Sequence, residues 1–442
     1  MSLARVVRRF SSAPGATFRE AIGVLRARRL LADTTVDDGD AAAVEAVFGA
    51  HGDARGVPAV YAGFDPTAPS LHVGNLVQVM ALLRFAQAGF RPIALVGGAT
   101  AQIGDPSGRE DERDGMDAVT LERNVAGIHG QLEGIFARHE LNVTVVNNLD
   151  WTSGLAVLDF YKHFAGHFRL SSMLGKTSVK TRLDRGMSFT EFSYQIFQGL
   201  DFLHLFREHD CRIQVGGSDQ FGNITAGTEL IRKVTGREAA GVTTSLLVSR
   251  TGEKFGKSAG NAVWLDARAT SVFDFYQYLL RADDDAVHQL LRSLTFVDAA
   301  EIDAPVPGGS AQQLLADAVT TFVHGADGLA KAKATTEVLF GGKSIAQAAG
   351  HVDAEDLVRL QDVPRATVAH GDLPMAWPDA LVLLGASKSK GEARRLLKDG
   401  GVSVNGERLA AGAQNVTRED LFQDRVALVR VGKRRHFLLI AS

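Results

Sequence analysis

The chain has 442 residues, of which 45% are hydrophobic, so it is long enough for about two to four ordinary globular domains. Its single cysteine, Cys211, excludes a disulfide framework and a cysteine-based zinc site. No apolar run approaches the ~20 residues needed to cross a bilayer. The formal net charge of −3 hides a basic end, because residues 385–442 contain twelve Lys or Arg against six Asp or Glu. An RNA-contacting appendage has this composition, although a solvated charged tail explains the charge alone equally well.

The N-terminus is rich in arginine and contains no acidic residue before Glu20. Arg5, Arg8, Arg9 and Arg19 are accompanied by serines and a threonine, and the apolar core of a secretory signal is missing. This pattern is typical of mitochondrial or chloroplast transit peptides. We therefore expect residues 1–25 to be a transit peptide and the protein to reside in the mitochondrial matrix, with plastid or dual targeting as alternatives. A disordered start of a cytosolic protein is the other interpretation.

Short apolar runs alternate with helical stretches from residue 57 onward. The sequence predicts strands in VPAVYAGFD, RPIALVGGAT and LNVTVVNNLDW, and a helix in LVQVMALLRFAQAG that ends at Gly89. Strand, helix and strand at this spacing predict an α/β fold with a doubly wound parallel sheet. We assign residues 26–250 to this Rossmann-like domain, whose ligands are expected at the carboxyl ends of the strands.

The second half of the chain changes its pattern. Residues 251–270 form a loop and connection, and residues 271–345 are predicted to be a helical domain. Residues 346–378 have weaker periodicity and are interpreted as a linker. Residues 379–442 are predicted to form a small α+β domain with two helices, a hairpin and two closing strands.

A glycine-flanked segment, YAGFDPTAPSLHVGN, follows the first predicted strand. Gly63 and Gly74 allow close approach of the backbone, and the next helix presents free N–H groups and a positive dipole to anions. Thr67 and His72 add side-chain donors for phosphate oxygens. Taken alone, such a segment is more often a structural turn with a helix-capping histidine.

A second segment, TGEKFGKSAGN, carries Lys254, Lys257 and Ser258 between glycines. Two lysines on a mobile loop can close over a polyphosphate and neutralise the charge that develops on a leaving group. A Lys-x-x-Lys pair on its own is usually a solvated surface pair. Combined with the upstream His-Val-Gly-Asn, however, it indicates a nucleotide site.

These two segments resemble the "HIGH" and "KMSKS" motifs of class I aminoacyl-tRNA synthetases, and their surroundings resemble the tyrosyl-tRNA synthetases, of the mitochondrial or organellar type. The resemblance covers the chain from about residue 25 to the C-terminus. Besides the lysine loop, four stretches carry it in the family's order: YAGFDPTAPSLHVGN, RPIALVGGATAQIGDPSGR, SFTEFSYQIFQGLDF and QVGGSDQFGNITAG. It implies a homodimeric, ATP-dependent ligase that joins L-tyrosine to tRNA(Tyr) without membrane association.

A polar stripe supports tyrosine as the substrate. Tyr194, Gln198 and Asp201 are spaced to share one face of a predicted helix, and polar groups on an otherwise apolar helix need partners. The alternative is a purely structural role, in which Asp201 caps the helix or is exposed to solvent. By resemblance, Tyr194 and Gln198 bind the substrate ammonium together with Asp105, whereas Asp201 and Tyr61 bond the phenolic hydroxyl. Such a site rejects an analogue without the hydroxyl, so no editing domain is expected.

The remaining site residues also follow from the resemblance. The tyrosine set includes Gln214, and the ATP-binding set is Gly63, Asp65, His72, Gly74, Gly217, Asp219, Gln220 and Lys257. The catalytic set is Thr67, His72, Asn75, Arg109, Arg113, Lys254, Lys257 and Ser258.

The chain departs from the family's pattern at a few positions. Asn75 replaces the second histidine of the motif, Phe221 replaces a frequent tryptophan, and Arg109 stands where many relatives have lysine. KFGKS replaces KMSKS. None of these changes removes a group that the chemistry needs.

The implied first step is attack of the tyrosine carboxylate on the α-phosphorus of ATP, which gives tyrosyl-adenylate and pyrophosphate. The carboxylate is already ionised, so catalysis consists of positioning and electrostatic stabilisation. Mg²⁺ is expected to accompany ATP without a dedicated protein metal site, and no tightly bound cofactor is expected.

The C-terminal stretch PDALVLLGASKSKGEARRLLKDGGVSVNGERL resembles a small RNA-binding domain first known from a ribosomal small-subunit protein. Residues expected to contact tRNA phosphates are Lys388, Lys390, Arg394, Arg395 and Lys398. Two other functions remain open, namely a tryptophan-specific relative and an RNA-binding or splicing protein on the same fold.

Overall fold

The computed structural model describes residues 14–49, 57–107, 115–183, 186–247, 255, 257–258, 261–303, 311–348, 350–361, 363–410, 412–432 and 435–442. It contains two compact units. The first unit is Met1–Val263 with Asp284–Ala311, and the second unit is Trp264–Asp283 with Gln312–Ser442. Among the described helices, none is long and apolar enough to cross a membrane.

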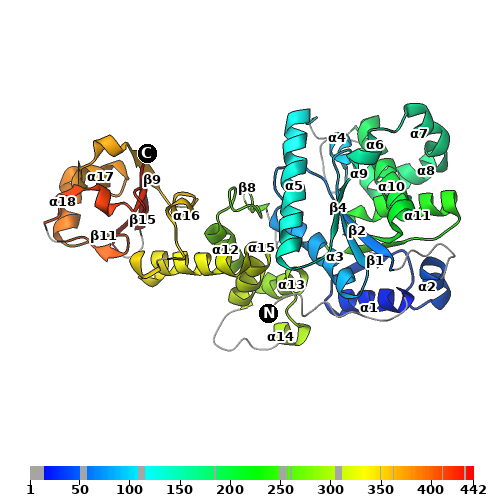
Figure 1. The fold of residues 1–442 in the computed structure, drawn as a ribbon, viewed down its shortest axis with the longest axis horizontal. Coiled ribbons are helices and arrows are strands. Elements are labelled where there is room, and N and C mark those ends of the chain that lie inside the picture. The colour runs from blue at the N-terminus through cyan, green and yellow to red at the C-terminus, as the bar shows by residue number, and fades with distance from the viewer. Residues whose placement is uncertain are drawn as a thin grey trace. The chain divides into compact units, whose positions relative to one another are not determined.

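The first unit is built on a six-stranded sheet (Figure 1). Its strands are β1 (Leu31–Thr34), β2 (Ala59–Phe64), β3 (Arg91–Val96), β4 (Thr144–Asn147), β5 (Cys211–Gly217) and β6 (Ala240–Thr244), in the order β1-β6-β5-β2-β3-β4. All neighbours are parallel except β1, which runs antiparallel to β6. The expected doubly wound parallel sheet is confirmed. Strands added after β2 extend the sheet in one direction and those from β5 in the other, so the topological switch lies between β2 and β5.

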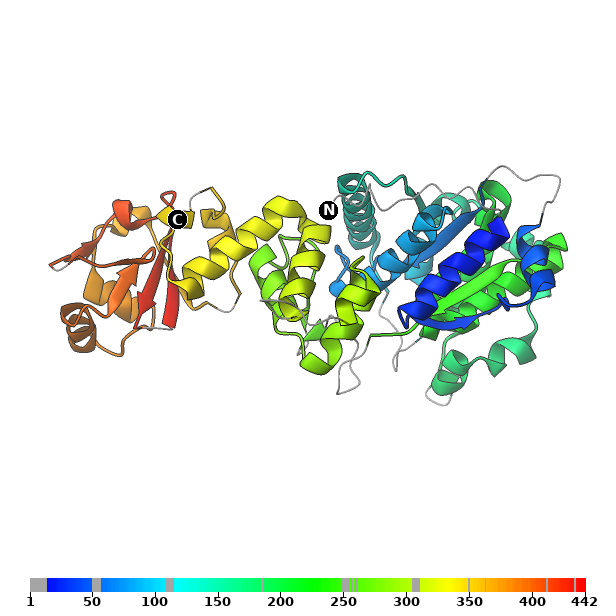
Figure 2. The same ribbon diagram turned by 90° about the horizontal axis from the view of Figure 1, so that it is seen from below.

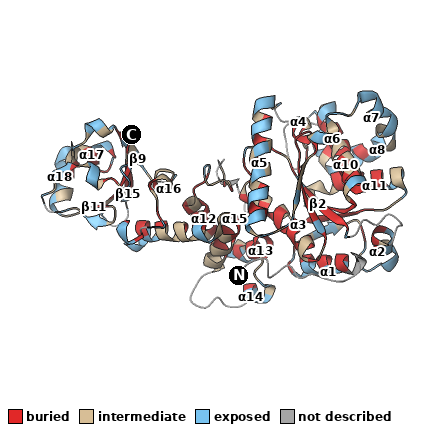
Figure 3. Cartoon of the chain, viewed as in Figure 1, coloured by how far each residue is buried: buried red, intermediate tan, exposed pale blue. Residues whose placement is uncertain are grey.

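Helices cover both faces of this sheet (Figure 2). The described helices of this unit are α1 (Pro14–Ala27), α2 (Ala41–Phe48), α3 (Leu76–Gln87), α4 (Thr100–Ile103), α5 (Ala118–Arg138), α6 (Leu149–Thr152), α7 (Val157–His163), α8 (Leu170–Gly175), α9 (Thr177–Leu183), α10 (Phe189–His209), α11 (Phe221–Thr235), α13 (Asp284–Leu294) and α14 (Ala299–Asp303). Tyr61 and Ile93 face a core with Phe202 of α10 and Leu230 of α11. Because strand side chains alternate, the other face of β2 is left for α3. The four central strands β2, β3, β5 and β6 are almost wholly buried (Figure 3), whereas the edge strands β1 and β4 are partly exposed.

Helix α1 is part of the folded core. Phe18, Ile22 and Leu25 are fully buried, and the ring of Phe18 lies 4.9 Å from that of Phe48. The expected transit peptide of residues 1–25 therefore overlaps a helix that packs into the first unit. An amphipathic helix rich in arginine has the same pattern whether it is a targeting signal or covers a core.

Helices α13 and α14 belong to the first unit, although the sequence predicted one helical domain over 271–345. Two buried arginines explain the docking of α13. Arg28 donates to the carbonyls of Arg292, Thr295 and Val297, and Arg84 donates to those of Arg292 and Thr295. Cations at the C-terminal end of a helix complement its dipole and its unpaired carbonyls.

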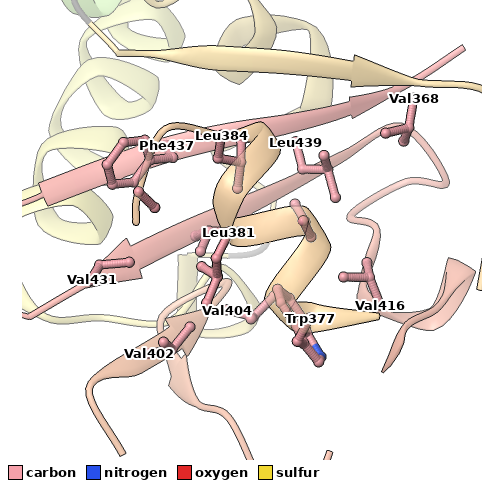
Figure 4. Close-up of a cluster of buried hydrophobic side chains, with 14 of the residues drawn as sticks. Val368, Trp377, Leu381, Leu384, Val402, Val404, Val416, Val431, Phe437 and Leu439 are labelled. Carbon is pink, nitrogen blue, oxygen red and sulfur yellow. The ribbon is translucent and has the colours of Figure 1, made fainter. Parts of the chain in front are cut away.

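The second unit combines helices with a mixed sheet, in which only the edge strand β9 is parallel to its neighbour. Its helices are α12 (Val272–Leu280), α15 (Ala311–Thr336), α16 (Ala354–Val358), α17 (Trp377–Leu383) and α18 (Lys390–Lys398). The main sheet has the order β12-β11-β14-β15-β9, formed by β9 (Arg365–Val368), β11 (Val402–Val404), β12 (Glu407–Arg408), β14 (Val426–Val431) and β15 (Arg435–Ala441). A small pair joins β10 (Met375–Ala376) to β13 (Asn415–Val416). Helix α17 packs Trp377, Leu381 and Leu384 onto the main sheet (Figure 4).

The segment 346–378 is not a free linker. It contains α16 and β9, and β9 pairs in parallel with β15 along its whole length. The apolar residues Val352 and Leu357 share a core with Val426 and Leu428 of β14. The weak periodicity of this segment reflects one short helix and one short edge strand, which period-based prediction detects poorly.

Candidate active site

The loop that follows β2 lies at the topological switch and is held from outside by α5. Asn124 donates to the carbonyl of Pro66 at 3.1 Å, and Gln131 accepts from the backbone N–H of Leu71 at 2.8 Å. A Cβ atom on Gly127 would lie 2.2 Å from the carbonyl oxygen of Pro69, so α5 needs glycine there to approach the loop. This scaffold sets the positions of Asp65 and of the exposed Thr67. Sequence analysis missed Asn124 and Gln131, because their partners are about 60 residues away in sequence.

His72 and Asn75 form one capping unit at the start of the helix. The backbone N–H of His72 donates to Asn75 Oδ1 at 2.9 Å, and His72 Nδ1 accepts from the backbone N–H of Gly74 at 3.1 Å. Since Nδ1 accepts, the proton of the neutral ring lies on Nε2, which is then a donor. The nitrogen of the Asn75 amide is likewise a donor, because its oxygen is used in the cap.

The lysine loop approaches this cap. A Cβ atom on Gly74 would lie 2.8 Å from the carbonyl oxygen of Phe255, so the two motifs meet at this glycine. The backbone of Lys257 and Ser258 forms β7 (Lys257–Ser258), which pairs with β8 (Asn261–Ala262). Lys254, Arg109 and Arg113 lie outside the described residues.

Asp201 and Tyr61 are both buried within the first unit. Asp201 is 3% exposed and accepts hydrogen bonds from Asn148 Nδ2 and Trp151 Nε1, each at 2.9 Å. Burial raises the pKa of Asp201 to about 7, although these two hydrogen bonds oppose the shift. Burial, assisted by the nearby charge of Asp201, raises the pKa of the Tyr61 phenol well above its ordinary value. The Tyr61 hydroxyl is buried and bonds to no described group.

Tyr194 lies at the other end of the polar stripe, where it contacts Asp65. The Tyr194 hydroxyl donates to Asp65 Oδ2 at 2.8 Å, while the Thr100 hydroxyl donates to Asp65 Oδ1 at 2.7 Å. Burial, together with Asp65 and Asp105, raises the pKa of Tyr194 well above its ordinary value. The phenol of Tyr194 is therefore a neutral donor beside carboxylates.

Asp105 forms a second polar group with residues of α11 and the turn before it. Gln220 donates to Asp105 Oδ2 at 2.7 Å, and Asn223 lies 3.3 Å from Asp105 Oδ1 and 3.1 Å from Gln198 Oε1. Burial raises the pKa of Asp105, and hydrogen bonds from Ser107 and Gln220 oppose that shift. The predicted residues Asp105, Gln198 and Gln220 are thus brought together, with Asn223 as a member that the sequence did not reveal.

The remaining predicted residues from β2 and β5 lie at the ends of these central strands. Gln214 is buried on β5, and its Oε1 has no hydrogen-bond partner among the described groups. A Cβ atom on Gly217 would lie 2.7 Å from Asp219 Oδ1, so this turn is closely packed. Gly63 is exposed near the end of β2.

Thr100, Asn148 and Trp151 are three further site residues that the sequence analysis missed. Thr100 begins α4, and Asn148 and Trp151 follow the end of β4. Their position after parallel strands was the available signal, because ligands bind at that edge. A threonine, an asparagine and a tryptophan in separate segments nevertheless form no recognisable motif.

The five predicted RNA-contacting residues lie in the second unit. Lys388, Lys390, Arg394, Arg395 and Lys398 are all exposed, on or just before α18. Ser389 caps α18 by accepting from the N–H of Glu392. Lys390 pairs with Asp379 at 2.5 Å.

Comparison with known proteins identifies the family to which the chain belongs. The family model described as tRNA synthetases class I (W and Y) matches residues 54–341, and the model of the tyrosine–tRNA ligase SYY-like C-terminal domain matches residues 354–439. A tyrosine–tRNA ligase of Anaeromyxobacter dehalogenans is 42% identical over 395 residues, which are 87% of this chain and 93% of that protein. A mitochondrial tyrosine–tRNA ligase of Drosophila melanogaster is 41% identical over 418 residues, with coverages of 87% and 88%.

A solved structure gives the same result. The crystal structure of a C-terminally truncated mitochondrial tyrosyl-tRNA synthetase from Aspergillus nidulans matches with a TM-score of 0.64 at 30% identity, covering 74% of this chain and 97% of that one. The chain therefore belongs to the tyrosine–tRNA ligases, a family of class I aminoacyl-tRNA synthetases.

Proposed function

We propose that this chain activates L-tyrosine with ATP to tyrosyl-adenylate and pyrophosphate, and then transfers tyrosine to the 3′ end of tRNA(Tyr). One observation carries the choice of tyrosine. The buried Tyr61 hydroxyl bonds to no described group, and the carboxylate of Asp201 near it is an acceptor. A substrate phenol completes this pair by accepting from Tyr61 and donating to Asp201. Phenylalanine leaves the Tyr61 hydroxyl unpaired and offers Asp201 no further donor beyond Asn148 and Trp151, and this family is the established example of such discrimination.

The residues around Asp65 and Asp105 suit the substrate ammonium. Both carboxylates are already bonded by neutral donors, Tyr194 to Asp65 and Gln220 to Asp105, which keep them in place. A cation entering between carboxylates gains charge-assisted hydrogen bonds. Gln198 and Gln214 are proposed as further polar partners of the amino acid.

We assign ATP binding to the segment YAGFDPTAPSLHVGN and to the lysine loop TGEKFGKSAGN, together with the glycine turn at the end of β5. Thr67, His72 and Asn75 donate to phosphate or ribose oxygens, and Gly63, Gly74 and Gly217 allow the nucleotide to approach the backbone. Asp219 accepts from a ribose hydroxyl. Cations from Arg109, Arg113, Lys254 and Lys257, with the hydroxyl of Ser258, stabilise the charge that passes to pyrophosphate. Mg²⁺ accompanies ATP in this proposal.

The tryptophan-specific alternative is the nearest rival, since the matching family model includes enzymes for both amino acids. ATP–pyrophosphate exchange should be measured separately with tyrosine, tryptophan and phenylalanine. We expect efficient exchange only with tyrosine. Efficient exchange with tryptophan instead would replace the proposal by its rival, and no exchange with any amino acid would favour an RNA-binding protein that has lost catalysis.

The second unit is proposed to bind tRNA through α18. Its exposed cations, Lys388, Lys390, Arg394, Arg395 and Lys398, are suited to phosphate contacts that position RNA without reading its sequence. A splicing or other RNA role would use the same surface. Aminoacylation of tRNA(Tyr) compared with binding of unrelated RNA distinguishes the two.

A homodimer is supported by exposed apolar residues of the first unit, on and between helices α7 to α10. They include Val157, Leu158, Tyr161, Leu170, Leu174, Leu183 and Phe189, with exposed fractions between 40% and 81%. Clustered apolar side chains of this size mark interaction surfaces. Leu158→Asp should convert the dimer to a monomer in light scattering, whereas Leu383→Asp, also at an exposed leucine but in the second unit, should not. A wild-type chain that is monomeric would contradict the proposal.

Localisation in the mitochondrial matrix is supported by mitochondrial relatives and by the acid-free, arginine-rich start of the chain. Import of a reporter fused to residues 1–30 tests it, with isolated plastids as the second arm. A reporter that stays outside both organelles would contradict organellar targeting.

A further inference from the structure

The two ends of the tyrosine site are joined by a continuous line of hydrogen bonds, which are buried at Asn148 and partly buried at Asp65. Tyr194 and Thr100 both donate to Asp65, Asn148 donates to Thr100 Oγ1 at 3.1 Å, and the same amide donates to Asp201 at 2.9 Å. Thr100 is 3% exposed and Asn148 is fully buried. Asp65 lies at the proposed ammonium end and Asp201 at the phenol end, so Thr100 and Asn148 bridge the site.

The direction of each bond in this line is fixed. Asn148 Oδ1 accepts from the backbone N–H of Ala99 at 2.7 Å, so its NH₂ group must face Thr100 and Asp201. Thr100 Oγ1 therefore accepts from Asn148 and uses its single proton for Asp65, a carboxylate that can only accept. No group in the line can reverse its role without leaving a buried donor or acceptor unpaired.

Close packing leaves this arrangement little freedom. A Cβ atom on Gly97 would lie 2.0 Å from Asp65 Oδ1 and 2.4 Å from Thr100 Oγ1, so the backbone of the turn after β3 lies directly against the bond between them. The rotamers of both side chains are thereby restricted. A hydroxyl that lies between two fixed partners sets the orientation of both.

We propose that Thr100 is a positioning residue for tyrosine selection: its hydroxyl orients Asp65 directly and Asp201 through Asn148, and so couples recognition of the ammonium to recognition of the phenol. The inference rests on the proposed function, because it assumes that tyrosine occupies this pocket. Thr100 itself does not contact the substrate. Because its hydroxyl orients both carboxylates, removal of the hydroxyl should weaken selection for the ammonium and for the phenol together.

Thr100→Val, which keeps the shape and removes the hydroxyl, tests the proposal. Selection at each end is measured with a probe that lacks one group: phenylalanine lacks the hydroxyl, and 3-(4-hydroxyphenyl)propionate, used as a competitive inhibitor, lacks the ammonium. The wild-type enzyme should bind both probes much more weakly than tyrosine. In Thr100→Val we expect the KM for tyrosine to rise with little change in kcat, and both preferences to shrink by about tenfold.

Two further variants separate positioning from folding. Thr100→Ser keeps the hydroxyl and should restore both preferences. Thr335→Val removes another buried threonine hydroxyl, which donates to the carbonyl of Lys331 at 2.9 Å in the second unit, and should change neither. Should Thr100→Val fail to fold, Thr100→Ala removes the same oxygen without the branched side chain.

Unchanged preferences in a folded Thr100→Val or Thr100→Ala enzyme would overturn the proposal. A loss confined to one end would also overturn it, because it would show that the ends are read independently. These outcomes are distinct from failure of the proposed function, in which the wild-type enzyme would not activate tyrosine at all.

Discussion

Trp151 donates its indole N–H to Asp201 at 2.9 Å, and His204 stacks on the same indole with ring centroids 4.2 Å apart and planes inclined by 13°. The carboxylate of Asp201 is therefore held by two N–H donors, Trp151 on one oxygen and Asn148 on the other. One lone-pair direction on each oxygen is used before any substrate arrives. Each oxygen keeps a second lone pair, and we assign one of these two acceptor positions to the phenol of tyrosine.

Replacement of Trp151 by phenylalanine should leave the Asp201 carboxylate less well oriented. Trp151→Phe keeps an aromatic ring under His204 but removes the donor to Asp201, so the KM for tyrosine should rise by about tenfold while that for phenylalanine changes little. Exchange kinetics with both amino acids measure the effect. Trp377→Phe is the matched control, since the Trp377 indole N–H has no partner among the described residues and lies in the second unit. Full tyrosine preference in Trp151→Phe would show that the bond is dispensable.

The pKa of Asp201 predicts a pH dependence of tyrosine binding. Its value of about 7 in the empty pocket means that the carboxyl takes up a proton as the pH falls below this point. The protonated form is a poorer acceptor for the substrate phenol, so the KM for tyrosine should rise by about tenfold between about pH 8 and about pH 6. Phenylalanine has no hydroxyl, and its KM should stay flat. If the two amino acids showed the same pH profile, the titration would belong to another group.

Helix α1 should be essential for the stability of the first unit. Phe18 is fully buried, so Phe18→Ala should lower the free energy of unfolding by about 3–5 kcal/mol, measured by urea denaturation. Val24 is 39% exposed on the same helix, and Val24→Ala should change it by less than about 0.5 kcal/mol. Equal, small effects of both substitutions would mean that α1 contributes little to the stability of the first unit.

The cations of α18 should contribute affinity for tRNA that depends on salt. Combined substitution of Arg394 and Arg395 by alanine should weaken tRNA binding and reduce the slope of log K against log salt by about 0.7–0.9 for each phosphate that the variant no longer neutralises. Arg418→Ala, at another exposed arginine of the second unit, is the control. Tyrosine-dependent pyrophosphate exchange should remain unchanged in both. An unaltered salt slope in the double variant would assign tRNA binding to a different surface.

The sequence predicted the parallel sheet and the polar stripe of α10 because both depend on local periodicity. Tyr194 and Asp201 lie on one face of a helix whatever that helix packs against. The line from Asp65 through Thr100 and Asn148 to Asp201 was not predictable, since it joins four segments that only the folded sheet brings together.

The packing partners of the helices could not be predicted from the sequence either. Helix α13 has the same amphipathic pattern whether it packs within a helical domain or against Arg28 and Arg84 of the first unit. Likewise, an acid-free start suited to a leader does not reveal that Phe18 contacts Phe48. Periodicity identifies the buried face of a helix but not its partner.

The most direct test of the tyrosine pocket is formation of the aminoacyl-adenylate by the wild-type enzyme and by Tyr61→Phe, which loses only one hydroxyl. We predict that the wild-type enzyme forms adenylate from tyrosine, and that kcat/KM for tyrosine relative to phenylalanine falls by about tenfold in the variant. A wild-type enzyme that forms no adenylate from tyrosine, or a variant with an unchanged ratio, would contradict the assignment of this pocket.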